Sequence, residues 1–241
     1  PKQTQALYNH WLEVNKSTFS TPAAEVDGWQ AIIFGTGSQG VTEAKLKSLG
    51  VGTCLIVGES DLDVLEKQIS QLDNQFPTLL LNGGDLLEKS AVSHLYDSLK
   101  ESDVVYCDTD EVDNDGAKSS PRFLPSWNPE LQYSTAYINS GVMIKTSLIK
   151  SLHISHQTTI AELITELSLT KKDVYIHRKP LPLVHLSSVK ENRLNTLKRV
   201  KKVIESHTSA VVDFDEKFSV NRLCWPNSNS LVSLIIPTKN G

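Results

Sequence analysis

A run of acidic residues between positions 102 and 116 holds the side chains best suited to chemistry. An apolar stretch there ends in four aspartates: Asp108, Asp110, Asp113 and Asp115. Unpaired carboxylates are too costly to bury, so we expect these four to sit in water or to hold a cation. An Asp-X-Asp arrangement such as Asp108-Thr109-Asp110 could hold a divalent metal ion against a diphosphate. The alternative is a solvated loop at the end of a strand.

The composition is that of an ordinary globular protein. The chain has 241 residues, a formal net charge of -4 and a pI near 6.0, so we expect neither a polyanion-binding surface nor a nucleic-acid partner. Three widely spaced cysteines (Cys54, Cys107 and Cys224) argue against a disulfide framework or a zinc site. No apolar run approaches the ~18 residues of a membrane span, and no signal peptide opens the sequence. We therefore expect a cytoplasmic protein, which could lie at the inner face of the membrane.

Strands and helices are predicted to alternate through the first half of the chain. Apolar, β-rich runs cover residues 29–34, 53–57, 78–81 and 103–107. Helical periodicity covers residues 42–49, 62–72 and 88–99. This alternation predicts an α/β fold with a mostly parallel sheet flanked by helices. Ligands of such sheets bind at the carboxyl ends of the strands, which here are residues 35–40, 58–61, 82–85 and 108–110.

The pattern is looser outside this region. A helix at 4–14 and a polar linker open the chain. After the acidic run we expect a proline-rich, non-helical crossing around Trp127, a strand near 142–144, a helix at 159–169, a strand at 173–177 followed by residues 179–182, and a basic helix at 192–206 with an apolar stripe. Residues 231–241 read as a buried strand running into a turn, and a domain rarely ends there. We therefore expect a fragment of a longer protein.

A glycine-rich loop follows the first predicted strand and could bind phosphate groups. Gly35, Gly37 and Gly40 form a Gly-X-Gly-X-X-Gly pattern before a helix, and Glu59 ends the next strand, where a ribose-binding acid would lie. This pattern is typical of a dinucleotide site for NAD, although so short a glycine pattern is easily met by chance. The alternative is a loop that replaces the nucleotide-binding turn of another kind of α/β enzyme.

Five segments, in order, resemble motifs of the family-2 glycosyltransferases. Residues 79–99 resemble the family's "LLDhDD-L, then helix" segment, 105–116 its "YSDED…G", 121–129 its "P-FKPdWsP", 173–185 the late strand before "LYHWR", and 231–241 the opening strand "VSIIIPT-NG" of another such domain. The likeness is to bacterial proteins that carry two of these domains in tandem.

This resemblance implies a GT-A fold, the Rossmann-like α/β fold of nucleotide-diphospho-sugar transferases, over residues 29–225. An N-terminal helix and linker (1–28) would precede it, and a linker with the first strand of a truncated second glycosyltransferase domain (226–241) would follow. The implied function is transfer of a sugar from a nucleotide-sugar donor to a glycan acceptor in surface-polysaccharide biosynthesis, with the second domain as a partner in cis. A divalent cation, Mn²⁺ or Mg²⁺, would neutralise the leaving diphosphate, and a carboxylate would deprotonate the acceptor hydroxyl.

The sequence departs from the family at three places where the chemistry is done. The metal-binding aspartates of the family are replaced in the segment 82–84, which reads Asn-Gly-Gly, and only the following Asp85 remains. The nucleobase-binding aspartate is replaced by Gly58, with Glu59 beside it. The segment that normally supplies the base has no aspartate, so that Glu162 or His156 would be the substitute.

The candidate residues follow from these positions. The metal ligands would be Asp85, Asp108 and Asp110; the nucleotide contacts Gly35, Thr36, Gly37 and Glu59; and the base Glu162. His177, Arg178 and His185 could face a diphosphate. Because so much of the chemistry is altered, the alternative is a non-catalytic scaffold or acceptor-binding domain beside an active second domain. A further alternative is an NAD-binding Rossmann domain that uses the loop 35–40.

Overall fold

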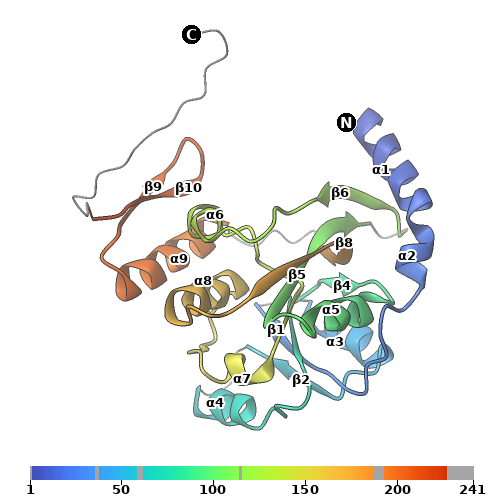
Figure 1. The fold of residues 1–241 in the computed structure, drawn as a ribbon, viewed down its shortest axis with the longest axis horizontal. Helices are drawn as coiled ribbons and strands as arrows, with labels where there is room; N and C mark the ends of the chain where they lie inside the picture. The colour runs from blue at the N-terminus through green and yellow to red at the C-terminus, as the bar shows by residue number, and fades with distance from the viewer. Residues whose placement is uncertain (1, 36–37, 59–61, 114–115, 187–192, 227–241) are drawn as a thin grey trace.

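The predicted apolar runs pair into one central sheet in the computed structural model, which describes residues 2–35, 38–58, 62–113, 116–186 and 193–226 (Figure 1). The strands are β1 (Gln30–Phe34), β2 (Thr53–Ile56), β3 (Thr78–Asn82), β4 (Leu86–Leu87), β5 (Val104–Val112), β6 (Lys118–Arg122), β7 (Val142–Ile144) and β8 (Ile176–Leu186). Their order across the sheet is β2-β1-β3-β7-β5-β8-β4, and β6 pairs with β5.

The sheet is mixed but mostly parallel in strand direction, because β1, β2, β3, β5 and β8 all run the same way. Strand β1 pairs in parallel with β2 and β3, and β5 pairs in parallel with β8. Strand β7 lies antiparallel between β3 and β5, while β4 and β6 are antiparallel partners of β8 and β5. The predicted fold class, an α/β fold with a mostly parallel sheet flanked by helices, is confirmed.

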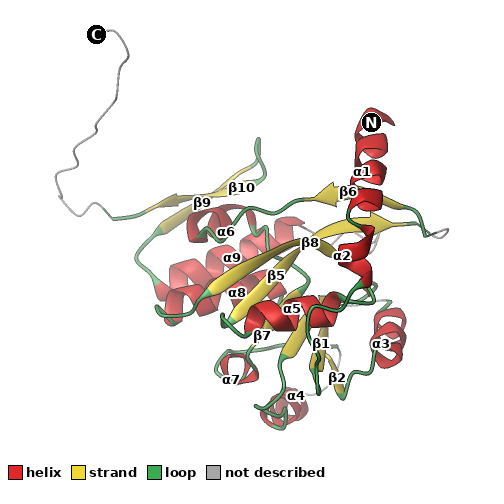
Figure 2. Ribbon diagram, turned by 45° about the vertical axis from the view of Figure 1, so that its right-hand side comes forward, coloured by secondary structure: helices red, strands yellow, loops and turns green. Residues whose placement is uncertain are grey.

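Helices cover both faces of the sheet (Figure 2). They are α1 (Lys2–Val14), α2 (Lys16–Ser20), α3 (Gln39–Ser48), α4 (Leu62–Ser70), α5 (Ala91–Leu99), α6 (Pro129–Thr135), α7 (Thr146–Ile149), α8 (Ile160–Thr170) and α9 (Arg193–His207). Ile32 of β1 packs in one core cluster with Leu65 of α4, and the adjacent Ile33 packs in another with Leu95 of α5. Successive strand residues point to opposite faces, so a strand covered on both sides needs the unbroken apolar run seen in the sequence.

Short polar signals set the ends of several helices. Helix α8 begins after Thr159, which forms a capping box with Glu162 and so satisfies amide groups of the first turn. Helix α3 ends before Gly50, whose φ of +83° is a left-handed conformation that favours glycine. Helix α6 begins at Pro129, and the side chain of Asn128 accepts a hydrogen bond of 2.8 Å from the third residue of the helix.

Strand β5 is longer than the sequence predicts. The strand was expected to end at residue 107, yet it runs through Asp108, Thr109 and Asp110 to Val112, with these residues paired to β8. The prediction that the acidic residues lie beyond the strand is therefore wrong for the first two aspartates. The physical reason is that each meets a hydrogen-bonding partner inside the fold, as described below.

Strand β8 also differs from its prediction. It begins at Ile176 rather than at residue 173, and it includes the segment 179–182 that was expected to follow it. Its register with β5 shifts here, because Cys107 pairs with Lys179 while the next residue pairs with Pro182. Proline has no amide hydrogen to give to a ladder, so the strand bulges at this point.

The C-terminal part of the described chain forms a satellite layer. A hairpin of β9 (Val211–Asp215) and β10 (Val220–Cys224), not predicted from the sequence, packs with α6, α8 and α9 around a third apolar cluster. The predicted strand at 231–241 lies outside the described residues, so the second domain that it indicated stays a prediction. No helix among the described residues is long and apolar enough to cross a membrane.

The N-terminal segment contacts the sheet rather than standing apart. Part of the expected polar linker is helix α2, and the side chains of Tyr8 and Phe19 are buried. The Ser90 hydroxyl donates a hydrogen bond of 2.5 Å to the backbone carbonyl of Phe19, and the ring of His94 bonds to the carbonyl of Thr18 at 2.9 Å. Figures 1 and 2 both place α1 beside β6, and the two elements are in contact.

Candidate functional site

The loop after β1 has the glycine that its geometry requires. Gly35 has a φ of +81°, and its carbonyl accepts a hydrogen bond from the side chain of Gln39, the first residue of α3. A Cβ added at Gly40 would meet nothing within 4 Å, so the close helix–strand packing expected of the third glycine in a dinucleotide fingerprint is not found there. Thr36, Gly37 and Glu59 lie outside the described residues, and their role as nucleotide contacts stays a prediction.

The loop after β3 is fixed by internal hydrogen bonds. The Asp85 carboxylate is buried and accepts bonds from the hydroxyl of Ser140 at 2.5 Å and from the amide of Asn82 at 3.2 Å. The hydroxyl of Thr42 accepts from the amide of Gly84 at 2.8 Å and donates to the carbonyl of Asp85 at 2.9 Å. The one aspartate that remains in this loop thus holds the loop in shape.

Asp108 forms a two-pronged ion pair with Arg178. The guanidinium donates from Nε to Oδ1 at 2.9 Å and from a terminal nitrogen to Oδ2 at 2.7 Å. The amide of Leu124 donates a third bond to Oδ1 at 2.9 Å. The Asp108 side chain is 1% exposed and that of Arg178 is 22% exposed, so the pair is largely shielded from water. Such paired geometry is what makes a buried carboxylate tolerable.

Asp110 lies in a second buried network. Its carboxylate, which is fully buried, accepts a bond of 2.5 Å from the hydroxyl of Tyr8 and contacts Nδ1 of His185. The other ring nitrogen of His185 lies 3.3 Å from Oε1 of Glu88, which is also paired with Lys118. This chain of five side chains joins α1, β5, β6, β8 and the residue after β4. Its members come from widely separated parts of the sequence.

Burial controls the protonation of two members of this network. The pKa of Tyr8 is raised by burial first and then by its hydrogen bond to Asp110, so the hydroxyl stays a donor at any physiological pH. The pKa of Lys118 is lowered by burial, which disfavours its charged form.

These contacts correct the expectation of a solvated loop for the first two aspartates. Asp108 and Asp110 are buried, and Arg178, Tyr8 and His185 supply their partners from inside the protein. Within the described part of the chain, no group of three or more histidine, cysteine or acidic side chains is arranged to hold a metal ion. As placed, Asp85, Asp108 and Asp110 do not fit a shared divalent cation, since their oxygens already face protein donors. Their role as metal ligands stays a prediction.

Glu162, the predicted base, has a structural role in the fold. One carboxylate oxygen accepts from the amide of Thr159 at 2.7 Å within the capping box, and the other lies 3.5 Å from the guanidinium of Arg199 on α9. It joins the start of α8 to the helix beside it. Its role as a catalytic base stays a prediction.

The residues expected to face a diphosphate are used in two ways. Arg178 and His185 face Asp108 and Asp110, whereas His177 is only half-buried and lies beside the ring of Tyr175. The sequence did not predict that Tyr8, Glu88 and Lys118 belong to the Asp110 network. Only Tyr8 left a signal, because it falls on the helical face that also carries Trp11.

Comparison with known proteins gives weak structural matches and no sequence match. No protein-family model matches the sequence, and no curated protein matches it. Residues 1–349 of TarS from S. aureus superpose with a TM-score of 0.48 and 13% identity, covering 79% of this chain and 68% of that one. The same protein in complex with UDP-GlcNAc gives a TM-score of 0.47 and 12% identity, covering 79% and 69%. The 4-diphosphocytidyl-2C-methyl-D-erythritol synthase from Anaerococcus prevotii gives 0.38 and 12%, covering 71% and 97%. At identities of 12–13% and TM-scores below 0.5, these likenesses do not establish a family or an activity for this chain.

Proposed function

We propose that this chain is a glycosyltransferase-type domain that supports sugar transfer without carrying out the metal-dependent step itself. It would stand beside a second glycosyltransferase domain in cis, as a scaffold or as a module that binds the glycan acceptor. The observation that carries this proposal is the internal pairing of Asp108 with Arg178 and of Asp110 with Tyr8 and His185.

Metal-dependent transfer needs carboxylates at the end of a strand whose oxygens can bind the ion. The oxygens of Asp108 are instead held by Arg178 and by the amide of Leu124. A divalent cation of the Mg²⁺ or Mn²⁺ type binds through carboxylate oxygens and water. To reach Asp108, such a cation would have to displace Arg178 and the amide of Leu124 from a side chain that is 1% exposed. Breaking a buried ion pair is strongly unfavourable, on the order of 3–5 kcal/mol.

The loop after β3 supports the same proposal. Gly83 and Gly84 offer no side-chain ligand, and the carboxylate of Asp85 is held by Ser140 and by the amide of Asn82. Glu162 is engaged in the capping box at the start of α8, which also supports a role in the fold rather than as a catalytic base. What remains intact is the sheet and its helices, which is what a supporting domain requires.

Calorimetry separates this proposal from its rivals. Residues 1–241 are titrated with UDP-GlcNAc, and separately with UDP, with and without Mn²⁺. The supporting role predicts no binding that depends on the metal. Mn²⁺-dependent binding that is lost in Asp85→Asn would overturn it and restore the active transferase. Metal-independent binding of NADH would replace both with a dinucleotide-binding function.

A further inference from the structure

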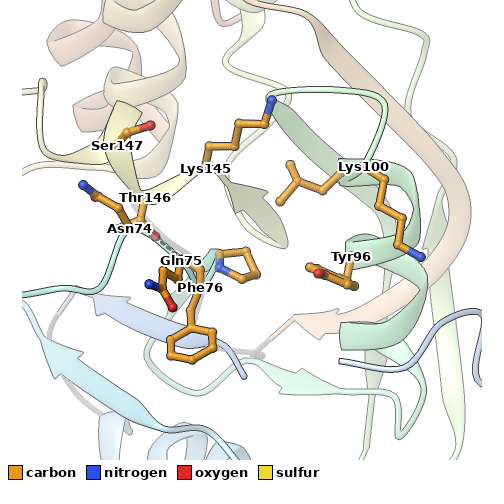
Figure 3. A pocket seen from close by; sticks show the side chains of 10 residues that line it. Asn74, Gln75, Phe76, Tyr96, Lys100, Lys145, Thr146 and Ser147 are labelled. Carbon is orange, nitrogen blue, oxygen red and sulfur yellow. Dashed lines mark hydrogen bonds between the residues drawn. The ribbon is translucent and has the colours of Figure 1, made fainter. Parts of the chain in front are cut away.

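A hollow of about 300 Å³ lies beyond the ends of central strands, on the side of the sheet opposite the carboxyl ends of its parallel strands. Three segments form its walls: the turn before β3, the end of α5, and the junction of β7 with α7 (Figure 3). It is remote from the Asp108 and Asp110 networks, because the lining residues of two of its walls precede the starts of β3 and β5, whereas the two aspartates lie late in β5. Its volume is at the lower end of the range for small-molecule sites, the size of a single sugar unit.

The walls of this hollow are held by hydrogen bonds between its segments and within its turn. The hydroxyl of Thr146 donates to the carbonyl of Phe76 at 2.5 Å and shares a bond of 2.7 Å with the hydroxyl of Thr78. On the same turn, the amide of Gln75 donates to the Asp73 side chain at 2.8 Å. The turn and the β7–α7 junction are therefore held together, so the hollow is formed by the fold itself.

The lining combines an apolar floor with a polar rim. Pro77 and Leu99 are buried, and Figure 3 places the ring of Tyr96 across the hollow from Gln75 and Phe76. Apolar rings of this kind pack against the C–H face of a sugar, while amide groups can donate to and accept from its hydroxyls. The hollow is thus suited to a ligand with one apolar face and many hydroxyls.

Two lysines stand at the rim of the hollow. Lys100 and Lys145 both line the hollow, and no acidic side chain is among its lining residues. Each lysine has a carboxylate partner just outside: Lys145 lies 2.7 Å from Asp103, and Lys100 lies 3.5 Å from Asp97. Both lysine side chains are about half exposed, and exposed pairs of this kind are weak, so a negative ligand can share the ammonium groups at little cost.

We propose that this hollow binds a sugar unit that carries a negative group, either a carboxylate as in a hexuronate or a phosphate as in a hexose phosphate. The sugar ring lies on Tyr96 and Leu99, and the negative group faces Lys100 and Lys145. This site gives the domain a glycan-recognition surface that is independent of any nucleotide site.

Heteronuclear NMR titration of residues 1–241 tests the site, with glucuronate, glucose 1-phosphate, glucose and inorganic phosphate as separate probes. We expect chemical-shift changes that map to the hollow with one or both charged sugars, and the stronger of the two identifies the negative group. Glucose binding as tightly as the charged sugars would overturn the role of the lysines. Inorganic phosphate binding as tightly as glucose 1-phosphate would overturn the role of the sugar ring. Absence of shifts with both charged sugars would overturn the site.

Lys100→Ala and Asn74→Ala test the lining without disturbing the core, since both side chains are exposed. Each is expected to weaken binding about fivefold or more, the scale of a lost charged or polar contact. The matched control is Lys47→Ala, because Lys47 is also an exposed lysine with an acidic partner on its own helix, at 2.7 Å. An equal effect in the control would show non-specific charge attraction and refute the proposal.

Discussion

The pairing of Asp108 with Arg178 makes a prediction that distinguishes a structural carboxylate from a metal ligand. Asp108→Asn keeps the shape of the side chain but removes its charge, leaving the Arg178 guanidinium beside a neutral amide. Breaking a buried ion pair in this way costs about 3–5 kcal/mol. We expect a value near the lower end, about 3 kcal/mol, because the Arg178 side chain is 22% exposed and can recover some hydration.

Thermal unfolding in the presence of EDTA measures this effect without any metal. For a chain of this size, 1 kcal/mol corresponds to about 2–4 °C in Tm, so Asp108→Asn should unfold about 6–12 °C below the wild type. The matched control is Asp113→Asn in the same acidic run, because Asp113 is exposed and accepts a hydrogen bond of 2.8 Å from the amide of Ala117 in its own turn. That variant should lose less than about 1 kcal/mol.

The double variant Asp108→Asn with Arg178→Gln completes the test. If the two side chains stabilise each other, the effects of the single substitutions will not add, and the interaction energy will exceed about 1 kcal/mol. The reasoning is refuted if Asp108→Asn has the Tm of the wild type in EDTA. It is also refuted if its only effect is loss of Mn²⁺-dependent stabilisation, since that is the signature of a metal ligand.

Four further substitutions probe the fold. Tyr8→Phe leaves a buried carboxylate without one of its donors and should cost about 1–3 kcal/mol in urea unfolding; an unchanged midpoint would mean that α1 does not depend on this bond. Gly141→Ala places a Cβ 2.9 Å from two side-chain atoms at a φ of +69°, whereas Gly50→Ala has open space at +83°. Both variants should lose about 1–2 kcal/mol of stability, the cost of holding an alanine in a left-handed conformation. Only Gly141→Ala should lose about 1–3 kcal/mol more, because its added Cβ overpacks the core. Burial lowers the pKa of His94, so its neutral form is favoured in the folded state. Stability should therefore fall as the pH drops below the ordinary histidine pKa of about 6.5, and His94→Gln should flatten that part of the profile.

The sequence predicts the sheet well where burial alone decides the structure. Strands β1 and β3 are buried at nearly every position and have apolar centres, because both of their faces are covered by helices. Their bounds were predicted to within one residue at each end. Strand β4 has only two residues, and the β9–β10 hairpin alternates weakly, so neither carries enough periodicity to be recognised alone.

The extension of β5 could not be predicted, because what stabilises it lies elsewhere in the chain. Asp108 is held by a residue 70 positions later, and Asp110 is held by Tyr8, 102 positions earlier. A local pattern of alternating aspartates therefore gives the same signal for a solvated loop, a metal site and a buried ladder. Only the tertiary partner decides among them, because the cost of burying a carboxylate depends on what it meets.

The candidate site shows how the same residues can carry two opposite interpretations. Asp108 was predicted to bind a metal ion, and Arg178 and His185 to face a diphosphate. In the fold Arg178 faces Asp108, and His185 faces Asp110. An arginine is always protonated, so Arg178 can neutralise Asp108 without any metal ion. Residues 82–84 read Asn-Gly-Gly and offer no carboxylate, while Arg178 supplies a positive charge inside the protein. The first feature leaves a metal ion without ligands there, and the second leaves Asp108 without an unbalanced charge. A substitution that only broke the Asp108–Arg178 pair would therefore not create a metal site, because the segment after β3 would still supply no carboxylate at residues 82–84.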